Sequence, residues 1–308
     1  MGACSYALFM RLAAPVLAML VARTAALGQQ IPGRDLFDFP LGSVAEGAAL
    51  ALQSGDGLRN PAGILLPTGA RGRLSISSLL TSSEQGVSAQ LASAAMLWRG
   101  NTLGISVARA SVTGIARTDS DPQSVGGDVP YGALVVSALA ARRQSRDLSA
   151  GLAVRLLRGE FDLTTRTAIG IDGGVVAEHL TRLDARVAAS SFFWRPASES
   201  GDGQTLSVSG DLRAVGKSDT RAARAGYAFS STPGLSREQY FFTSARYLAW
   251  EARTGVAWTD AFSHSATRWR LAVGVHVDRY FAAIAREDSP SGVAPSYQFT
   301  LTSTIPHH

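Results

Sequence analysis

The residues best suited to chemistry gather near the C-terminal end of the chain, where Arg268, Arg270, His276 and Asp278 all fall on even-numbered positions. A histidine beside an aspartate serves a hydrolase only when a nucleophile lies within hydrogen-bond reach. None of the many serines stands in a diagnostic setting, and the pattern Gly-x-Ser-x-Gly does not occur. We therefore expect no catalytic residues, and we predict that these four side chains, together with Asp172, form a polar cluster that faces a water-filled lumen.

The chain contains few residues that could bind a metal ion or take part in redox chemistry. The one cysteine, Cys4, has no partner, which excludes a disulfide scaffold, a zinc ribbon and an iron–sulfur centre. Any metal site would have to rest on carboxylates and five histidines, of which His307 and His308 are terminal. We predict no metal site and no cofactor.

The elements that must position the polar residues are strands. Along Arg268–Phe281, polar side chains alternate with Trp269, Leu271 and Val273, which gives one apolar face and one wet face. Alternation of this kind between turn residues is typical of strands and hairpins. It recurs in fourteen segments, at 74–80, 87–98, 101–112, 129–142, 148–158, 164–178, 181–194, 204–214, 220–230, 237–247, 249–260, 267–279, 280–287 and 295–305. Glycines inside them, such as Gly151, are predicted to let the sheet bend.

Strands of about ten residues with no intervening helices indicate an all-β transmembrane antiparallel barrel of about fourteen strands. A membrane interior demands that every backbone polar group be paired, so strands cross it only as a closed sheet with an apolar outside. Aromatic residues tend toward the segment ends, which suits interfacial girdles. The alternative is a soluble β-sandwich, in which the same aromatics would be core residues. No segment after residue 30 is apolar for long enough to be a membrane helix.

The N-terminal part of the chain has a different character. Arg11, the apolar run Leu12–Val21 and the small residues that follow it form the pattern of a cleavable export signal, predicted at 1–28. Residues 29–73 are rich in Ala, Gly and Leu and lack clean alternation. We predict that 29–73 fold back into the lumen as a hatch or plug, ahead of a transmembrane barrel at 74–305.

The charge of the chain gives no sign of nucleic-acid binding. The net charge is +5 and the isoelectric point is about 9.8, but Lys217 is the only lysine and the arginines are scattered among acids. A nucleic-acid surface needs a basic patch or stripe. We expect no nucleic-acid partner.

The hatch region carries a family resemblance. Gly47–Ala51, followed by Asn60-Pro61-Ala62-Gly63, resembles the N-terminal signature of the PorV/PorQ branch of FadL-like outer-membrane barrels. Later phrases, such as those at 104–108, 131–138, 148–157, 168–176 and 224–229, are similar to that family in the same order. The chain departs from it in three ways: the acidic pair before the Asn-Pro motif is reduced to Asp56, Glu46 replaces one glycine of the signature, and the C-terminal aromatic residue common in such barrels is not found at Ile305-Pro306-His307-His308.

The resemblance implies a non-enzymatic, monomeric barrel in the outer membrane of a Gram-negative-type bacterium, with membrane lipid around it. It implies either uptake and diffusion of hydrophobic compounds or an accessory role in type IX protein secretion, with hydrophobic small molecules or secretion-machinery proteins as partners. Asn60, Pro61, Ala62 and Gly63 would then form a hatch motif lining the ligand path, and a plain turn is the alternative reading of that motif. The remaining alternatives are a periplasmic or secreted soluble β-sandwich and a barrel lipid hydrolase.

Overall fold

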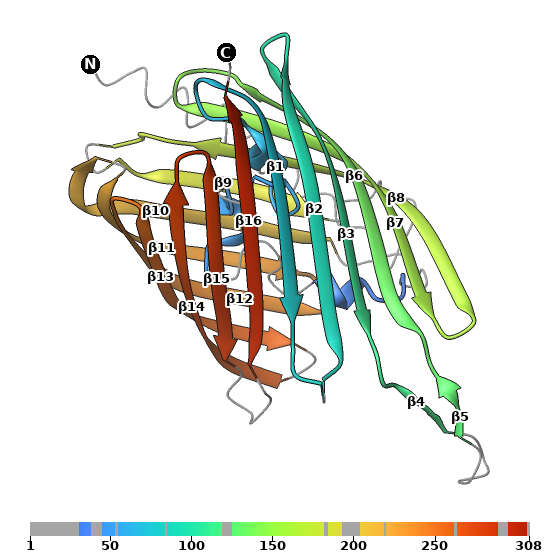
Figure 1. Ribbon diagram of the computed structural model, residues 1–308. Coiled ribbons are helices and arrows are strands. Elements are labelled where there is room, and N and C mark those ends of the chain that lie inside the picture. Colours follow the sequence, from blue (N-terminus) through green and yellow to red (C-terminus); the bar gives the residue numbers. More distant parts are fainter. Residues whose placement is uncertain are drawn as a thin grey trace.

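The protein forms a closed barrel of fourteen antiparallel strands (Figure 1). The computed structural model describes residues 31–37, 45–52, 55–83, 85–118, 125–181, 184–192, 204–218, 220–261, 264–288 and 295–306. The predicted export signal lies outside these residues. The strands of the barrel are β1 (Ala70–Leu80), β2 (Val87–Trp98), β3 (Asn101–Val112), β6 (Tyr131–Arg143), β7 (Leu148–Phe161), β8 (Thr164–Ala177), β9 (Arg186–Phe192), β10 (Thr205–Ser218), β11 (Arg221–Thr232), β12 (Ser236–Tyr247), β13 (Trp250–Ala261), β14 (His264–Val277), β15 (Tyr280–Asp288) and β16 (Ser296–Pro306).

The strands follow one another around the barrel in chain order, and β16 closes the circle by pairing with β1 from Ala70↔Pro306 to Leu80↔Tyr297. Closing the barrel gives the edges of β1 and β16 the backbone hydrogen bonds that they would lack in an open sheet. Between β3 and β6 the chain forms a separate two-stranded sheet, β4 (Ala116–Thr118) and β5 (Val125–Asp128), which extends beyond the barrel (Figure 1). The predicted fold class is confirmed.

Each predicted segment corresponds to one barrel strand, with shifted ends. β1 begins at Ala70 instead of residue 74, and β9 covers only Arg186–Phe192 of the predicted 181–194. The division between the segments at 267–279 and 280–287 is real, but the first strand stops at Val277. Asp278, predicted on the polar face of that strand, lies in the turn after it with a positive φ of 50°. Such a φ is typical of tight turns, in which Asp is one of the tolerated residues.

The outer face of the barrel is largely apolar, and most buried polar and charged side chains of the strands lie on the inner face. On β14, Trp269 and Leu271 are 60 % and 53 % exposed, whereas the intervening Arg270 is 3 % exposed. Exposed aromatic side chains lie near both ends of the strands: Trp98, Tyr247, Trp250 and Tyr280 at one end, and Phe161, Trp258, Trp269 and Tyr297 toward the other. Two such bands around an apolar belt are typical of a membrane-spanning barrel.

The two ends of the barrel differ in their connections. The short-turn end has the connections 99–100, 144–147, 178–185, 219–220, 248–249 and 278–279. The long-loop end has the connections 81–86, 113–130, 162–163, 193–204, 233–235, 262–263 and 289–295. In outer-membrane barrels the short turns face the periplasm and the longer loops face outward.

The described residues 31–37, 45–52 and 55–67, ahead of β1, lie inside the barrel, and we call them the inner segment. It contains three single 3-10 turns, η1 (Arg34–Phe37), η2 (Ala48–Leu50) and η3 (Pro61–Ile64). η1 contacts β3 and β6, η2 contacts β8 to β11, and η3 contacts β3 and β6 to β8. Among the helices of the described residues, none is both long and apolar enough to cross a membrane.

Candidate functional site

Two glycines of the barrel wall make room for the Asn-Pro motif of the inner segment. Gly151 on β7 and Gly174 on β8 are paired neighbours. A Cβ at Gly174 would lie 1.9 Å from Oδ1 of Asn60, and a Cβ at Gly151 would lie 2.4 Å from the backbone of Pro61. Gly151 therefore serves close packing of the inner segment against the wall, in place of the curvature role predicted for it.

Asn60 holds the inner segment together from a fully buried position. Its Nδ2 donates to the carbonyl of Ala49 at 2.7 Å, and its Oδ1 accepts from the backbone N–H of Ala62 at 3.0 Å. The second bond caps η3, and Pro61 follows at the first position of that turn, where a missing N–H costs nothing. Pro61, Ala62 and Gly63 are buried with Asn60. The predicted hatch motif is thus a buried turn that joins η2 to η3 and packs against the wall.

A second anchor is the ion pair between Arg155 on β7 and Asp172 on β8, whose side chains are both fully buried. Arg155 also donates to the carbonyl of Leu58 at 2.8 Å and to the hydroxyl of Ser137 at 3.2 Å. A buried charge needs both a counter-charge and further hydrogen bonds, and the inner segment supplies part of them. Asp172, predicted as a member of the lumenal cluster, therefore acts with Arg155 in fixing the inner segment.

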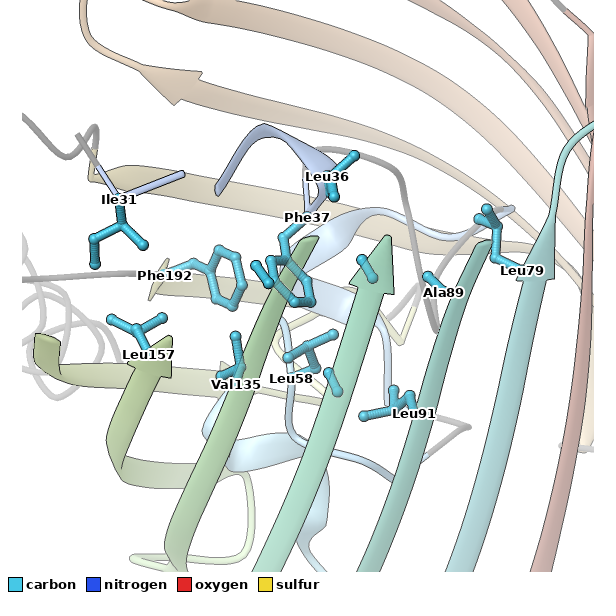
Figure 2. Close-up of a cluster of buried hydrophobic side chains, with 13 residues drawn as sticks. Ile31, Leu36, Phe37, Leu58, Leu79, Ala89, Leu91, Val135, Leu157 and Phe192 are labelled. Carbon is cyan, nitrogen blue, oxygen red and sulfur yellow. The ribbon is translucent and has the colours of Figure 1, made fainter. Parts of the chain in front are cut away.

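A third set of contacts is apolar and lies at the long-loop end. Leu36 and Phe37 of η1, with Ile31 and Leu58, meet inward side chains of the wall (Figure 2). These wall residues are Leu79, Ala89, Leu91, Ala108, Ala110, Ala133, Val135, Leu157 and Phe192. The lumen is therefore apolar on the side of β1, β2, β3, β6 and β7, at the end where the longer connections lie.

The opposite side of the lumen is charged. Arg270 donates to both carboxylate oxygens of Glu238, at 2.9 and 2.7 Å, and to Glu287 at 2.5 Å, while Arg268 donates to the other oxygen of Glu287 at 3.1 Å. His276 lies further along the same face of β14 and contacts Glu251 at 3.0 Å.

The predicted cluster is therefore only partly one site. Arg268 and Arg270 share a carboxylate, His276 belongs to a neighbouring group, Asp172 lies on β8 with Arg155, and Asp278 is exposed in its turn. Sequence reasoning missed the carboxylates that complete these pairs, Glu238, Glu251 and Glu287. All three lie on the inward side of strands whose outward face carries large apolar residues such as Phe241, Trp258 and Ile284, so strand parity is the signal that could have found them.

His276 is held between two neighbours. Its Nε2 lies 3.0 Å from the carboxylate of Glu251, and its ring centroid lies 4.5 Å from that of Phe281. Among the residues that the structure describes, no three His, Cys, Asp or Glu side chains are grouped to hold a metal ion.

Comparisons with known proteins identify the fold. No model of a protein family and no curated protein matches the sequence. Among solved structures, the chain is similar to the CymD monoaromatic hydrocarbon channel, with a TM-score of 0.57, 12 % identity, and coverage of 91 % of this chain and 98 % of that one. It is also similar to the Pseudomonas putida toluene transporter TodX (TM-score 0.56, 10 % identity, 91 % and 99 % covered) and to the Ralstonia pickettii toluene transporter TbuX (TM-score 0.55, 12 % identity, 86 % and 99 % covered). The chain thus has the closed fourteen-stranded barrel fold of FadL-like outer-membrane channels.

Proposed function

We propose that this protein is a non-enzymatic, monomeric outer-membrane channel for small hydrophobic compounds, with the inner segment as its hatch. The three similar structures are a monoaromatic hydrocarbon channel and two toluene transporters, which favours uptake of compounds of this class. The proposal includes export by a cleavable signal at 1–28 and a lipid-facing outer surface.

The observation that carries the proposal is the division of the lumen into an apolar and a charged side. A hydrophobic compound entering from the long-loop end would meet the wall of Leu79, Leu91, Val135, Leu157 and Phe192. Apolar surface gains about 25 cal/mol for each Å² removed from water, so such a compound is drawn along this wall. Ions and sugars gain nothing there.

The inner segment gives the channel its barrier. Three sets of contacts join it to the wall: Asn60 against Gly174 and Val175 of β8, Arg155 with its counter-ion Asp172, and the apolar contacts of Phe37. In this reading the motif Asn60–Gly63 anchors the hatch beside the ligand path, and a compound passes by displacing part of the segment.

Uptake of radiolabelled toluene by cells that lack other hydrocarbon channels tests the proposal. We expect cells producing this protein to take up toluene several-fold faster than empty-vector cells, with no change in uptake of a small sugar. Heat-modifiable gel mobility in the outer-membrane fraction checks that the barrel is folded and inserted. Equal toluene uptake in both strains, with the barrel inserted, would refute the proposal.

A second candidate function is that of a PorV/PorQ-type accessory of type IX secretion. The feature that favours it is the β4–β5 sheet, which projects beyond the barrel at the long-loop end, where a protein partner could dock (Figure 1). This role predicts co-purification of secretion-machinery proteins with the full chain and their loss when residues 116–128 are deleted. Recovery of the barrel without such proteins would count against it.

A further inference from the structure

A cavity of about 150 Å³ lies at the short-turn end of the lumen, away from the apolar wall. Its sides are formed by β9 to β13, and its roof by residues of the inner segment around η2. Its most distinctive lining is a group of five arginines, Arg186, Arg213, Arg224, Arg246 and Arg253.

The arginines outnumber the carboxylates that line this cavity. Three acids line it, Glu46, Asp211 and Glu251, against five arginines. Two more acids act on the same arginines from beside the cavity: Asp184 pairs with Arg213 at 2.6 Å and Arg224 at 3.0 Å, and Glu178 acts on Arg186. The five acids balance the five arginines while Glu46 is ionised, and its protonation leaves one positive charge in excess, which favours an anion.

The arginines also have more donors than the acids take up. Each guanidinium carries five N–H groups. Arg186 places two of them on Asp211, and Arg253 is shared between Glu46 at 2.6 Å and Glu251 at 2.7 Å. The half-buried Arg246 donates Nε to the carbonyl of Leu248 at 3.3 Å and forms no ion pair with any carboxylate that the structure describes.

We propose that this cavity binds a tetrahedral oxyanion, a phosphate or sulfate group, held mainly by Arg246, Arg253 and Arg224. Guanidinium groups match the oxygens of such anions in paired hydrogen bonds. The cavity has about ten times the volume that one buried water needs, so the site admits an anion with some of its water. This site is independent of hydrophobic uptake, because it lies on the charged side of the lumen.

Glu46 is the internal competitor for the site. Its carboxylate occupies a donor of Arg253 that an anion would use. Burial raises the pKa of Glu46 to about 7, so this carboxylate becomes neutral in mildly acid solution. The charged groups that face it are Arg253, Glu251, Arg186 and Asp56. We therefore expect tighter anion binding below pH 7 than above it.

Isothermal titration calorimetry of the full chain in detergent, at constant ionic strength set with chloride, tests the proposal. Sulfate is the probe for pH dependence because its charge is constant near neutrality, and inorganic phosphate and a short-chain phosphatidic acid distinguish a free anion from a lipid headgroup. We expect saturable one-to-one sulfate binding, tighter at about pH 6 than at about pH 8. Binding of either phosphate compound supports the proposal and identifies the source.

Three variants make the test specific. Arg246→Ala should weaken sulfate binding by about tenfold, the loss expected for one charged hydrogen bond. Glu46→Gln should tighten binding at pH 8 and remove the pH dependence. Arg142→Ala changes an exposed arginine at the same end of the barrel but outside the cavity, and it should have no effect. No saturable heat, or equal losses in Arg246→Ala and Arg142→Ala with both barrels folded, would overturn the proposal.

Discussion

Adding one methyl group to the wall at Gly174 should release the hatch. The new Cβ of Gly174→Ala would lie 1.9 Å from Oδ1 of Asn60, 2.8 Å from its Cγ and 3.1 Å from Cδ of Pro61. None of these atoms is the end of a flexible chain free to move aside, because Asn60 is fully buried and bonded at both ends of its amide. The inner segment must therefore shift away from β8.

The cost of this shift follows from the contacts that it breaks. The amide of Asn60 loses its long bond to the carbonyl of Val175 on β8, which is worth up to about 1 kcal/mol, and overpacking a tight site costs about 1–3 kcal/mol. A loss of about 3 kcal/mol in docking energy raises the undocked population of the hatch about a hundredfold. Because the strand backbone at Gly174 does not have a positive φ, alanine itself is tolerated in the sheet.

Single-channel conductance in planar bilayers measures the result. We expect Gly174→Ala to show frequent, larger openings to ions, and the inner segment to become sensitive to added protease. Gly210→Ala is the matched control, because a Cβ there meets its nearest atom at 3.5 Å and touches no part of the inner segment. Equal conductance and equal protease sensitivity in the two variants would refute the reasoning that the wall glycines hold the hatch.

Three further predictions concern the stability of the folded barrel, measured by denaturant unfolding in lipid vesicles. Asp172→Asn leaves the buried Arg155 without its counter-charge and should lower the free energy of unfolding by about 3–5 kcal/mol, whereas an effect within error would mean that the pair is solvated. The raised pKa of Glu46 means that the folded state binds more protons than the unfolded state between about pH 4.5 and pH 7, so stability should fall as pH rises through this window, and Glu46→Gln should flatten that part of the profile. Leu271→Arg places a charge in the middle of the outward face of β14 and should lower the free energy of unfolding by about 2–4 kcal/mol if that face contacts lipid. An exposed position in water would tolerate the change, so an unaltered free energy of unfolding would argue against a lipid-facing surface.

The sequence was enough to predict the barrel because strand alternation is a local signal. On β14, the apolar Trp269 and Leu271 occupy odd positions and Arg268 and Arg270 even ones. This alternation alone shows which residues face outward, without knowledge of the neighbouring strands. Alternation gave no clear sign of the tight turn between β14 and β15, because the pattern runs on from Arg268 to Phe281, and it therefore placed the turn residue Asp278 on the polar face of the strand.

The partners inside the lumen could not be predicted in the same way. Parity shows that Arg270 faces inward, but its carboxylate partners Glu238 and Glu287 come from two different strands, and only the closed barrel places them together. The role of Gly151 depended on where the inner segment lies, which no local pattern contains. A pair of inward glycines at paired positions on neighbouring strands, such as Gly151 and Gly174, is the signal that points to a close approach of another backbone.

The contacts that hold the hatch also determine where a hydrophobic compound would loosen it. Asn60 and Arg155 hold residues 57–62 through hydrogen bonds and a buried ion pair, which an apolar molecule cannot replace. Residues 31–37 are held by Leu36 and Phe37 against an apolar wall, with one buried hydrogen bond from Arg34 to Thr205. A hydrophobic compound offers the apolar wall the same kind of contact as Leu36 and Phe37. Opening should therefore begin at residues 31–37 and leave η3 docked. Hydrogen exchange in the presence of toluene should accelerate at 31–37 and stay slow at 60–64, whereas a uniform change across both would mean that the hatch moves as one body.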